Sequence, residues 1–353
     1  MPHYDFDFLV IIGRFQPVHK GHQELIVFSL QQARQLMVLC GSDNQHRSVR
    51  NPWTSEERET MLRSIVPKTD QARLRFFPIA DRPFSDKDWA REAERLILND
   101  LKTTDTITHP RIGLISADRD LLVRYAQLFP HWQSIFFADT GKEQNAQFKS
   151  TDLRNQLFQQ PLNAIQPTLQ QALPVSVLDF ITQFCATPAF QELREEHRFL
   201  TNFKRSWEAA PYPPTFVTVD AIVTQNECIL LVERKNRPGK GLFALPGGFI
   251  DQGEPLFQGC LRELREETRL AVPQETLTRA LQGSLVCDAP YRSARGRTIT
   301  HVFYMALPSQ ASLPEVEGCD DAKQAIWVPI SSLNPATLFE DHYFIIQKML
   351  HTE

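Results

Sequence analysis

Hydrophobic positions in the first part of the chain alternate between short β-rich runs and longer helical patterns. The run 6–12 is short and apolar, which predicts a buried strand, and a helical spacing follows over 20–35. Thr54, with Glu57 three residues on, is typical of a helix start, and we expect that helix over 56–65. Further strands are expected at 36–40, 74–78, 111–116 and 134–138. Alternation of this kind indicates an α/β fold, with a parallel sheet covered by helices on both faces.

The pattern changes after Arg154. Residues 155–205 are rich in glutamine and then helical, without a strand signal, and Pro211-Tyr212-Pro213-Pro214 is a stiff break. The segment beyond it is β-rich, with strands expected at 215–224, 228–234, 284–287, 298–307 and 325–328 and a helix at 255–270. We therefore expect two domains, 1–205 and 206–353.

The composition is that of an ordinary globular protein, with 42% hydrophobic and 23% charged residues in 353. A net charge of -4 gives no electrostatic footprint for nucleic acid, so local basic side chains must bind any anionic substrate. No apolar run approaches the roughly 20 residues that cross a membrane. The six cysteines form no C-x-x-C pair, which fits a reducing compartment. We expect a cytoplasmic protein that binds neither nucleic acid nor membrane; a homo-oligomer is compatible with the sequence.

The segment GRFQPVHKGH, residues 13–22, follows the first predicted strand. Gly13 lets the backbone approach a ligand closely. His19 and His22 are one turn apart at the start of a helix, whose free N–H groups and dipole favour phosphate, and Arg14 adds donors. The pattern predicts a polyphosphate site at the carboxyl end of a strand. The alternatives are a pair of surface histidines or a two-histidine metal site, the latter weaker because no carboxylate is suitably spaced.

This segment resembles the nucleotidyltransferases with an H-x-G-H signature, and later residues resemble their nicotinamide mononucleotide (NMN) adenylyltransferase branch, over about 6–200. The resemblance implies a Rossmann-like domain that joins NMN to AMP from ATP, giving NAD and pyrophosphate. The ATP-binding residues that it implies are Gly13, Arg14, Phe15, His19, His22, Ser150, Thr151 and Arg154. His19, His22, Arg14 and Arg154 would be catalytic, because they would neutralise the phosphates. Lys149 stands where the second phosphate motif has its first serine.

The same resemblance implies a set of NMN-binding residues: Arg50, Asn51, Trp53, Asp81 and Trp89. Trp53 follows Asn-Pro in a polar loop, so we interpret it as a ligand-side residue outside the core. Trp89 lies in a helical pattern with Ala93 and Leu96, and both a core and a ligand position stay open for it.

The strongest pattern lies at 248–270, where a glycine, a glutamate and the run RELREETRL are regularly spaced. Glu263 and Glu267 are four apart and share a helix face, and Arg262 and Glu266 share a neighbouring one. Neighbouring carboxylates repel unless a cation lies between them, so we expect Mg²⁺ at the first pair, with Mn²⁺ as the alternative, and an ion pair at the second. A solvated helix of salt bridges is the other interpretation, which the preceding Pro-Gly-Gly disfavours.

This pattern resembles the Nudix box, over about 212–350, and implies a Nudix α/β/α sandwich with a mixed sheet. The implied metal ligands are Gly248, Glu263, Glu266 and Glu267, the last two being catalytic. Arg269 replaces the second glycine of the box, so we expect the helix to end differently from a left-handed glycine cap. Candidate ADP-ribose contacts are Arg234, Phe243, Tyr291 and Arg297, with Arg292 and Arg295 in the same basic run.

The order of the two domains resembles the bifunctional enzymes of bacterial NAD metabolism. It implies ATP, NMN, NAD and ADP-ribose as ligands, and hydrolysis of ADP-ribose to AMP and ribose 5-phosphate. Two alternatives stay open: a second domain that senses ADP-ribose without cleaving it, and a different phosphorylated acceptor for the first. The general base of the hydrolase is not identified.

Overall fold

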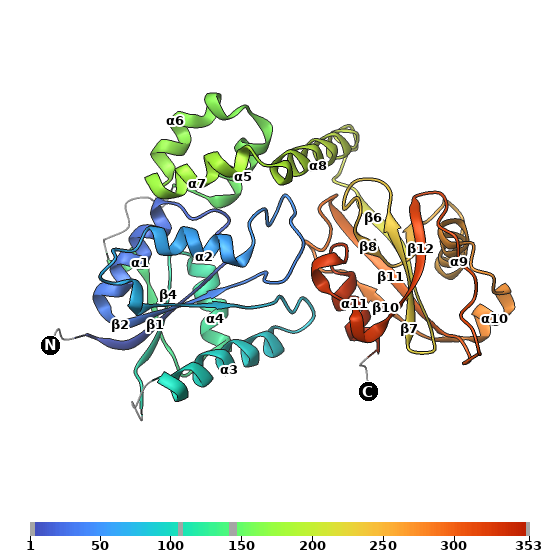
Figure 1. The fold of residues 1–353 in the computed structure, drawn as a ribbon, viewed down its shortest axis with the longest axis horizontal. Helices are drawn as coiled ribbons and strands as arrows, with labels where there is room; N and C mark the ends of the chain where they lie inside the picture. The colour runs from blue at the N-terminus through green and yellow to red at the C-terminus, as the bar shows by residue number, and fades with distance from the viewer. Residues whose placement is uncertain (1–3, 105–108, 141–146, 351–353) are drawn as a thin grey trace. The chain divides into compact units, whose positions relative to one another are not determined.

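The computed structural model describes residues 4–104, 109–140 and 147–350, and the chain divides into two compact units. The first is Met1–Glu195 and the second Glu196–Glu353, each with its own sheet and hydrophobic core (Figure 1). The division falls within one helix, α8 (Pro188–Arg205). None of the described helices is long and apolar enough to cross a membrane.

The first unit is built on a five-stranded parallel sheet in the order β3-β2-β1-β4-β5. Its strands are β1 (Phe6–Gly13), β2 (Ala33–Cys40), β3 (Leu74–Pro78), β4 (Ile112–Ser116) and β5 (Gln133–Phe136). The chain moves outward from β1 through β2 to β3 and then returns to the other side of β1. Such a reversal leaves a crevice at the carboxyl ends of the strands, which is where α/β sheets bind ligands.

Helices cover both faces of this sheet, as predicted. Leu9 and Ile11 of β1 share a core with α1 (Lys20–Gln32) and α2 (Ser55–Ser64). Phe8 and Val10 point to the opposite face, because side chains alternate along a strand, and share a core with α3 (Asp86–Thr104) and α4 (Arg119–Leu128). Short helical turns η1 (Gln71–Arg73) and η2 (Phe137–Thr140) precede β3 and follow β5.

The helix expected over 20–35 is shorter in the structure and ends at Gln32. Arg73 accounts for the early end, because its guanidinium donates to the carbonyl oxygens of Ala33 at 2.7 Å and Arg34 at 3.0 Å, and to that of Leu30. These bonds satisfy carbonyls that a continuing helix would use itself. The backbone therefore turns extended at Ala33, and β2 begins three residues before its expected start.

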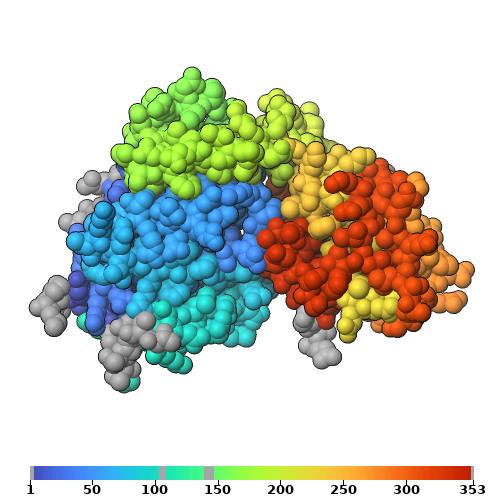
Figure 2. Space-filling model, in the orientation of Figure 1, coloured from blue at the N-terminus to red at the C-terminus, as the bar shows by residue number. Residues whose placement is uncertain are grey.

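Four helices complete the region that shows no strand signal: α5 (Ser150–Gln159), α6 (Leu162–Ala172), α7 (Val175–Cys185) and α8. Their apolar side chains join the core under α1 and α2. Figure 2 shows this green segment lying directly on the blue surface of the N-terminal residues. Lys20 connects the start of α1 to the end of α6, because its ammonium donates to the carbonyl oxygens of Gln170 at 3.1 Å and Gln171 at 2.7 Å.

The second unit is built on a mixed seven-stranded sheet with the order β10-β11-β6-β7-β12, in which β8 pairs with β7 and β9 with β6. Strands β6 and β11 are parallel, and the other pairs are antiparallel. The strands are β6 (Thr215–Gln225), β7 (Cys228–Arg234), β8 (Phe243–Ala244), β9 (Gly247–Phe249), β10 (Leu281–Cys287), β11 (Arg297–Ala306) and β12 (Ala322–Pro329). The mixed sheet agrees with the expected sandwich.

Helix α9 (Leu256–Thr268) packs on this sheet through Cys260, Leu261 and Leu264, which are buried. Two further helices, α10 (Gln274–Arg279) and α11 (His342–Leu350), and two helical turns, η3 (Ile330–Ser332) and η4 (Pro335–Thr337), complete the unit. Because the apolar face of α9 packs on the sheet, Glu263 and Glu267 on its other side are held toward β9.

Candidate active sites

The loop after β1 folds back over the end of its own strand. Phe15 has a left-handed backbone (φ 53) and is only 3% exposed. Its ring lies 3.0 Å from the point where a β-carbon on Gly13 would stand, so a larger residue at position 13 would displace the ring. Phe15, expected among the ATP-binding residues, thus lies in the core beneath the loop.

His19 and His22 meet at the start of α1, as their spacing predicts. His19 is the N-cap residue, and its backbone N–H donates to Nδ1 of His22 at 3.2 Å. The two rings stack with centroids 3.8 Å apart. Burial lowers the pKa of His19 to about 4, and burial together with the charge of His19 holds the pKa of His22 well below its usual range. Both imidazoles are therefore uncharged at neutral pH.

Three arginines from separate segments converge at the loop after β1. The pKa of Arg14 is lowered to about 10 by burial and by the charge of Arg50, and that of Arg154 to about 10 by burial and by Arg14 and Arg50. Arg154 donates to the carbonyl oxygen of Gln16, and Ser150 to that of Pro17 at 3.0 Å. The start of α5 thus lies against the loop after β1, as the predicted phosphate site requires.

Lys149 and Thr151 lie on the exposed side of the same helix start. Lys149 is the N-cap residue of α5, and its side chain makes no capping bond. The hydroxyl oxygen of Thr151 accepts from Arg154 Nη2 at 3.2 Å. Arg154 is consequently oriented from both sides, by Thr151 and by Gln16.

Asn51 and Asp81, both expected on the NMN side, are joined through Gln45, and Ser42 adds to the bonds of Asp81; sequence reasoning missed both residues. Asn51 accepts from Arg14 at 3.5 Å and donates to Gln45 at 3.3 Å. Gln45 donates to Asp81 at 3.0 Å, and Ser42 donates to the same carboxylate from its backbone at 3.1 Å and its hydroxyl at 2.8 Å. The signal for Ser42 and Gln45 was weak, since they are ordinary polar residues in a polar loop.

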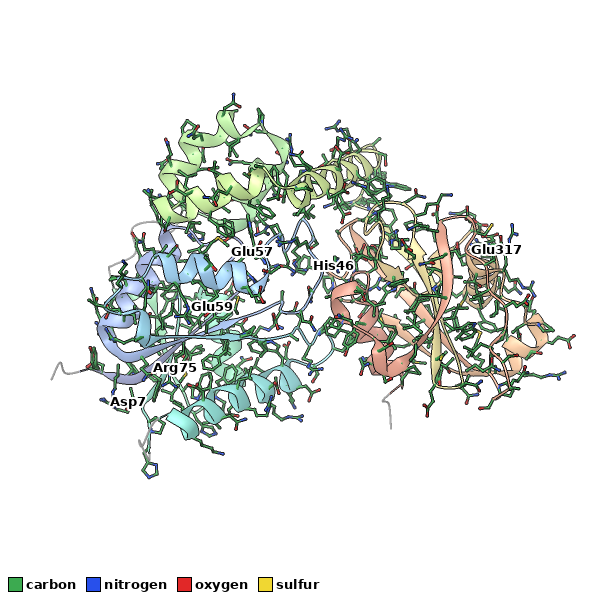
Figure 3. All side chains as sticks on the ribbon, in the orientation of Figure 1. Asp7, His46, Glu57, Glu59, Arg75 and Glu317 are labelled. Carbon is green, nitrogen blue, oxygen red and sulfur yellow. The ribbon has the colours of Figure 1, made fainter. Side chains whose placement is uncertain are left out.

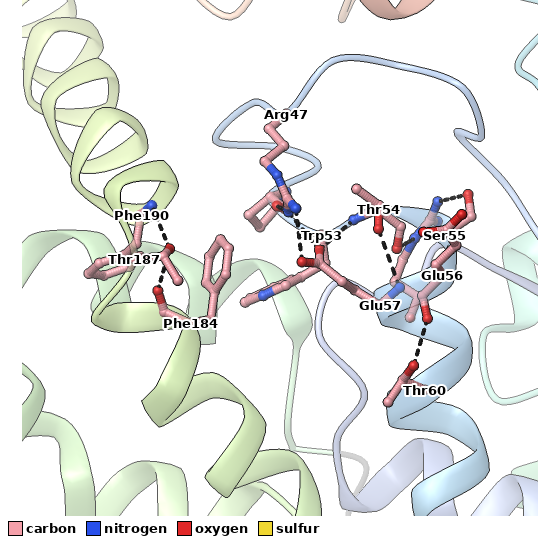
Figure 4. Close-up of polar contacts among 12 residues, drawn as sticks. Arg47, Trp53, Thr54, Ser55, Glu56, Glu57, Thr60, Phe184, Thr187 and Phe190 are labelled. Atoms are coloured by element: carbon pink, nitrogen blue, oxygen red, sulfur yellow. Dashed lines mark hydrogen bonds and ion pairs between the residues drawn. The ribbon is translucent and has the colours of Figure 1, made fainter.

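Trp53 corrects our interpretation, because it lies in the core at 2% exposed and packs against Phe184 with ring centroids 5.6 Å apart (Figure 4). Its backbone is held by Gln16, whose amide donates to Trp53 O at 2.8 Å and accepts from Trp53 N at 3.0 Å. Trp89 is half-buried and stacks on Tyr125 at 5.7 Å, so it contacts the core without being enclosed by it.

The capping pair before α2 is confirmed, and it supports the same loop. Thr54 Oγ1 accepts from the backbone of Glu57 at 3.3 Å, and the Glu57 carboxylate accepts from that of Thr54 at 2.9 Å and from both Nη atoms of Arg47 (Figure 4). Arg58, 1% exposed, donates to the carbonyl oxygens of Arg14 at 3.0 Å and Gly41 at 2.6 Å. Arg58 therefore joins the loops that follow β1 and β2.

In the second unit, Glu263 and Glu267 turn toward the glycine pair of β9. The Glu267 carboxylate is 6% exposed and accepts from the backbone N–H of Gly247 at 3.0 Å. A β-carbon on Gly248 would lie 2.6 Å from Glu263 Oε1, so a larger residue there would displace the Glu263 carboxylate. Burial raises the pKa of Glu267 to about 8 and also raises that of Glu263, and each carboxylate is further disfavoured by a neighbouring acid.

Arg262 holds the acidic residues around it. It donates to both oxygens of Glu254, at 2.7 and 3.2 Å, and to Glu263 and Glu266 at 2.9 Å each. The expected ion pair between Arg262 and Glu266 is therefore present. Gly259 is fixed by the same arrangement, because a β-carbon there would lie 2.7 Å from Glu254 Oε1.

The carboxylates suit a hard divalent cation by their chemistry. Glu263 and Glu267 are buried neighbours, both destabilised as anions, beside a glycine without a side chain. Within residues 4–104, 109–140 and 147–350, no group of three His, Cys, Asp or Glu side chains is arranged to hold a metal ion. Of the predicted set, Glu263 and Glu267 therefore suit a cation, while Glu266 pairs with Arg262.

Helix α9 ends in the left-handed conformation after all, which corrects our expectation. Arg269 adopts φ 45 and ψ 31, and its backbone N–H donates to Arg265 O at 2.9 Å. Its side chain pairs at 3.0 Å with that of Glu317, which is labelled in Figure 3. The backbones of Glu317 and Cys319 donate to the last carbonyls of α9. The loop at 317–319 thus caps the helix where glycine would ordinarily suffice.

The candidate ADP-ribose residues are distributed over several elements. Arg234 lies over the ring of Phe339, 4.2 Å from its centroid, and Phe243 is half-buried, with its carbonyl accepting from Phe339. Tyr291 is 80% exposed, and Arg297 donates to the carbonyl of Asp288. Asp220, a buried acid that sequence reasoning missed, accepts from Thr300 at 2.5 Å beside this region.

Two family models match the chain: the cytidylyltransferase-like family over residues 10–155 and the NUDIX domain over residues 214–349. The crystal structure of a bifunctional NMN adenylyltransferase/ADP ribose pyrophosphatase from Francisella tularensis, complexed with AMP and a manganese ion, is 33% identical with a TM-score of 0.87, over 98% of each chain. The chain belongs to this bifunctional family.

Two curated relatives match the units separately. A nicotinamide/nicotinic acid mononucleotide adenylyltransferase from Acinetobacter baylyi is 28% identical over 195 residues, 55% of this chain and 95% of the relative. An ADP-ribose pyrophosphatase from Methanocaldococcus jannaschii is 40% identical over 131 residues, 37% of this chain and 70% of the relative. The member of the bifunctional family described here is thus an enzyme that combines a nucleotidyltransferase unit and a Nudix unit.

Proposed function

We propose that the first unit transfers AMP from ATP to NMN, forming NAD and releasing pyrophosphate. Two observations carry this proposal: the convergence of Arg14, Arg50 and Arg154 at the carboxyl end of β1, and the stacked pair of His19 and His22 at the start of the helix that follows. An NMN phosphate oxygen would attack the α-phosphorus of ATP, and the bond to the β-phosphate oxygen would break. Such a transfer needs alignment and charge neutralisation more than a protein nucleophile.

The side chains divide this work by charge. Arg14 and Arg154 would neutralise the triphosphate, and the uncharged imidazoles would contribute hydrogen bonds to its oxygens. Arg50, Asn51, Asp81 and Trp89 would bind NMN, with Asn51 and Asp81 held in one network by Gln45. Trp53 would support this side through its backbone, which Gln16 fixes.

We propose that the second unit hydrolyses ADP-ribose to AMP and ribose 5-phosphate. The Gly248 carbonyl, Glu263, Glu266 and Glu267 would hold Mg²⁺, or Mn²⁺ in its place. Such an ion, when bound, polarises the pyrophosphate and activates the attacking water. Arg262 orients Glu263 and Glu266, and the backbone N–H of Gly247 orients Glu267.

Product analysis tests both reactions. The enzyme is incubated with ATP, Mg²⁺ and NMN, and separately with ADP-ribose and Mg²⁺ or Mn²⁺, and the products are identified by mass. We expect NAD in the first mixture, and AMP with ribose 5-phosphate in the second. Absence of hydrolysis with either metal would favour a sensor, and transfer to another phosphorylated acceptor would exclude NMN as the substrate.

We also propose that the chain is organised as domains 1–205 and 206–353, with the second half of α8 contributing to the stability of the second. Phe203 and Trp207 pack on Phe216 of β6, with ring centroids 5.4 and 5.3 Å apart. A hydrolase fragment that starts at Glu196 should therefore unfold at a higher temperature than one that starts at Ala209. Equal unfolding temperatures would show that the second half of α8 does not stabilise the second domain.

A further inference from the structure

A row of aromatic rings in the second unit ends beside the glycine pair of β9. Phe203 and Trp207 pack on Phe216, and Phe216 packs on Phe249 with ring centroids 5.8 Å apart. Phe216 is 9% exposed and Phe249 is 39% exposed. Phe249 is therefore supported by the buried ring of Phe216, while part of its own surface stays open.

A guanidinium lies over one face of the Phe249 ring. Arg295 lies over Phe249, 5.0 Å from the ring centroid. The other two arginines of the loop are committed elsewhere: Arg292 bonds both carboxyl oxygens of Asp341, at 2.8 and 3.0 Å, and Arg297 donates to Asp288 O. Among the hydrogen bonds of the described residues, the Arg295 guanidinium makes only a long one, from Nε to Ser293 Oγ at 3.5 Å.

Arg234 provides a second cation close to Arg295. Its Nε donates to Pro238 O at 2.8 Å, and one face of its guanidinium lies on the buried ring of Phe339. The pKa of Arg234 is lowered first by burial and then by the charge of Arg295, while Glu340 and Glu267 act in the opposite direction. Two half-buried cations that repel each other favour a polyanion between them, and this pair lies within electrostatic reach of Glu267.

We propose that Phe249 is the stacking surface for the adenine base of ADP-ribose, and that Arg295 and Arg234 bind the adjoining diphosphate. The assignment rests on the hydrolase function proposed above. An aromatic face beside a guanidinium recognises a planar, uncharged base by stacking. Phe249 follows Gly247 and Gly248 directly, and its carbonyl accepts from Arg262 at 3.2 Å, so its backbone adjoins the carboxylate site.

The alternation of side chains along β9 also places the proposed base-stacking ring and the carboxylates on opposite sides of the strand. Side chains alternate along a strand, and the Gly248 position faces Glu263, so Phe249 points to the other side. Phe249 is consequently a specificity residue that contacts the base and not the reacting atoms. Its loss should change substrate binding more than the chemical step.

Steady-state kinetics of the full-length enzyme with ADP-ribose and Mg²⁺ test the assignment. Phe249→Leu should raise KM by about tenfold or more, in line with the effect of removing one stacked base, and change kcat little. Inhibition by AMP should weaken by the same factor, and inhibition by ribose 5-phosphate should not change. Phe249→Tyr should restore KM. Phe199→Leu, at a ring 37% exposed on α8, is the matched control and should behave as the wild type.

Three results would overturn the proposal: an unchanged KM in Phe249→Leu, weaker inhibition by ribose 5-phosphate instead of AMP, or a loss of kcat and thermal stability that Phe249→Tyr does not restore. If the wild type does not hydrolyse ADP-ribose, the proposed function fails by itself. Calorimetric titration with ADP-ribose then decides the stacking assignment. Loss of one class of binding sites in Phe249→Leu alone supports it, and equal binding in both proteins refutes it.

Discussion

Replacing Glu267 by glutamine tests whether this residue is a metal ligand or an ordinary surface glutamate. The carboxylate is 6% exposed, accepts from Gly247 N–H at 3.0 Å and faces Glu263. Glutamine keeps the shape and an acceptor oxygen for Gly247 but loses the charge, which Mg²⁺ requires in its oxygen ligands. We expect the rate of ADP-ribose hydrolysis to fall by about a hundredfold or more, because a ligand contributes several kcal/mol to transition-state stabilisation.

While the rate of Glu267→Gln should fall, the stability of the metal-free variant should rise above that of the wild type. Burial raises the pKa of Glu267 from 4.5 to about 8, so the folded state binds a proton that the unfolded state has released. The carboxyl group therefore destabilises the fold increasingly as pH rises from 4.5 to 8, by roughly 3 kcal/mol at pH 7. Since glutamine does not ionise, Glu267→Gln should be the more stable protein in chelator at pH 7, and the difference should vanish toward pH 4.5.

The assay combines hydrolysis at saturating Mg²⁺ with thermal unfolding in chelator and in excess Mg²⁺. Mg²⁺ should stabilise the wild type and have little effect on the variant. Glu266→Gln is the comparison, because the Glu266 side chain is 46% exposed and pairs with Arg262 at 2.9 Å. Such a pair contributes at most about 1 kcal/mol, and we expect a smaller loss of rate. If Glu267→Gln hydrolyses ADP-ribose at the wild-type rate with the same Mg²⁺ dependence, the metal assignment is wrong.

Three further results are expected. His22→Ala should abolish NAD synthesis and leave ADP-ribose hydrolysis intact in product assays; near wild-type synthesis would remove His22 from the mechanism. Arg269→Gly should raise the free energy of unfolding by up to about 1 kcal/mol. Glycine adopts the left-handed backbone of Arg269 without strain, and the ion pair with Glu317 that is lost is exposed and weak. A destabilised variant would contradict this. Burial lowers the pKa of His342 to about 3, so below pH 6.5 the unfolded state binds a proton that the folded state does not. The free energy of unfolding therefore falls on acidification from pH 6.5, by about 3 kcal/mol at pH 4.5. Urea unfolding of wild type and His342→Gln at both pH values measures it, and equal pH dependence would refute it.

The sequence predicted the elements that repeat a pattern over enough residues. Strand β3 and strand β7 match their expected ranges, and α9 differs by one residue at its start and two at its end. Strands β8 and β9 have two and three residues, too few for a period to show. Helix α1 ended early because Arg73, forty residues away, binds its last carbonyls. A local pattern contains no information about such a partner.

The site residues divide in the same way. The approach of His19 to His22 and of Arg262 to Glu266 follows from helical spacing, so both could be predicted. Trp53 could not, because its burial depends on Phe184 in α7, and the sequence around it reads as a polar loop. Phe249 was overlooked for a related reason: its neighbours Phe216 and Arg295 come from distant segments.

The two sites use one electrostatic arrangement with opposite signs. In the first unit, burial and the charge of Arg50 disfavour the cationic forms of Arg14 and Arg154; in the second, burial disfavours the anionic forms of Glu263 and Glu267. Like charges crowded in a half-buried place destabilise the free protein, and a ligand of the opposite charge relieves that repulsion. Structural contacts maintain the crowding, since Gln16 O holds Arg154 and Gly247 N–H holds Glu267. Part of the affinity that we propose for a polyphosphate, or for a divalent cation, would therefore come from repulsion already present in the fold.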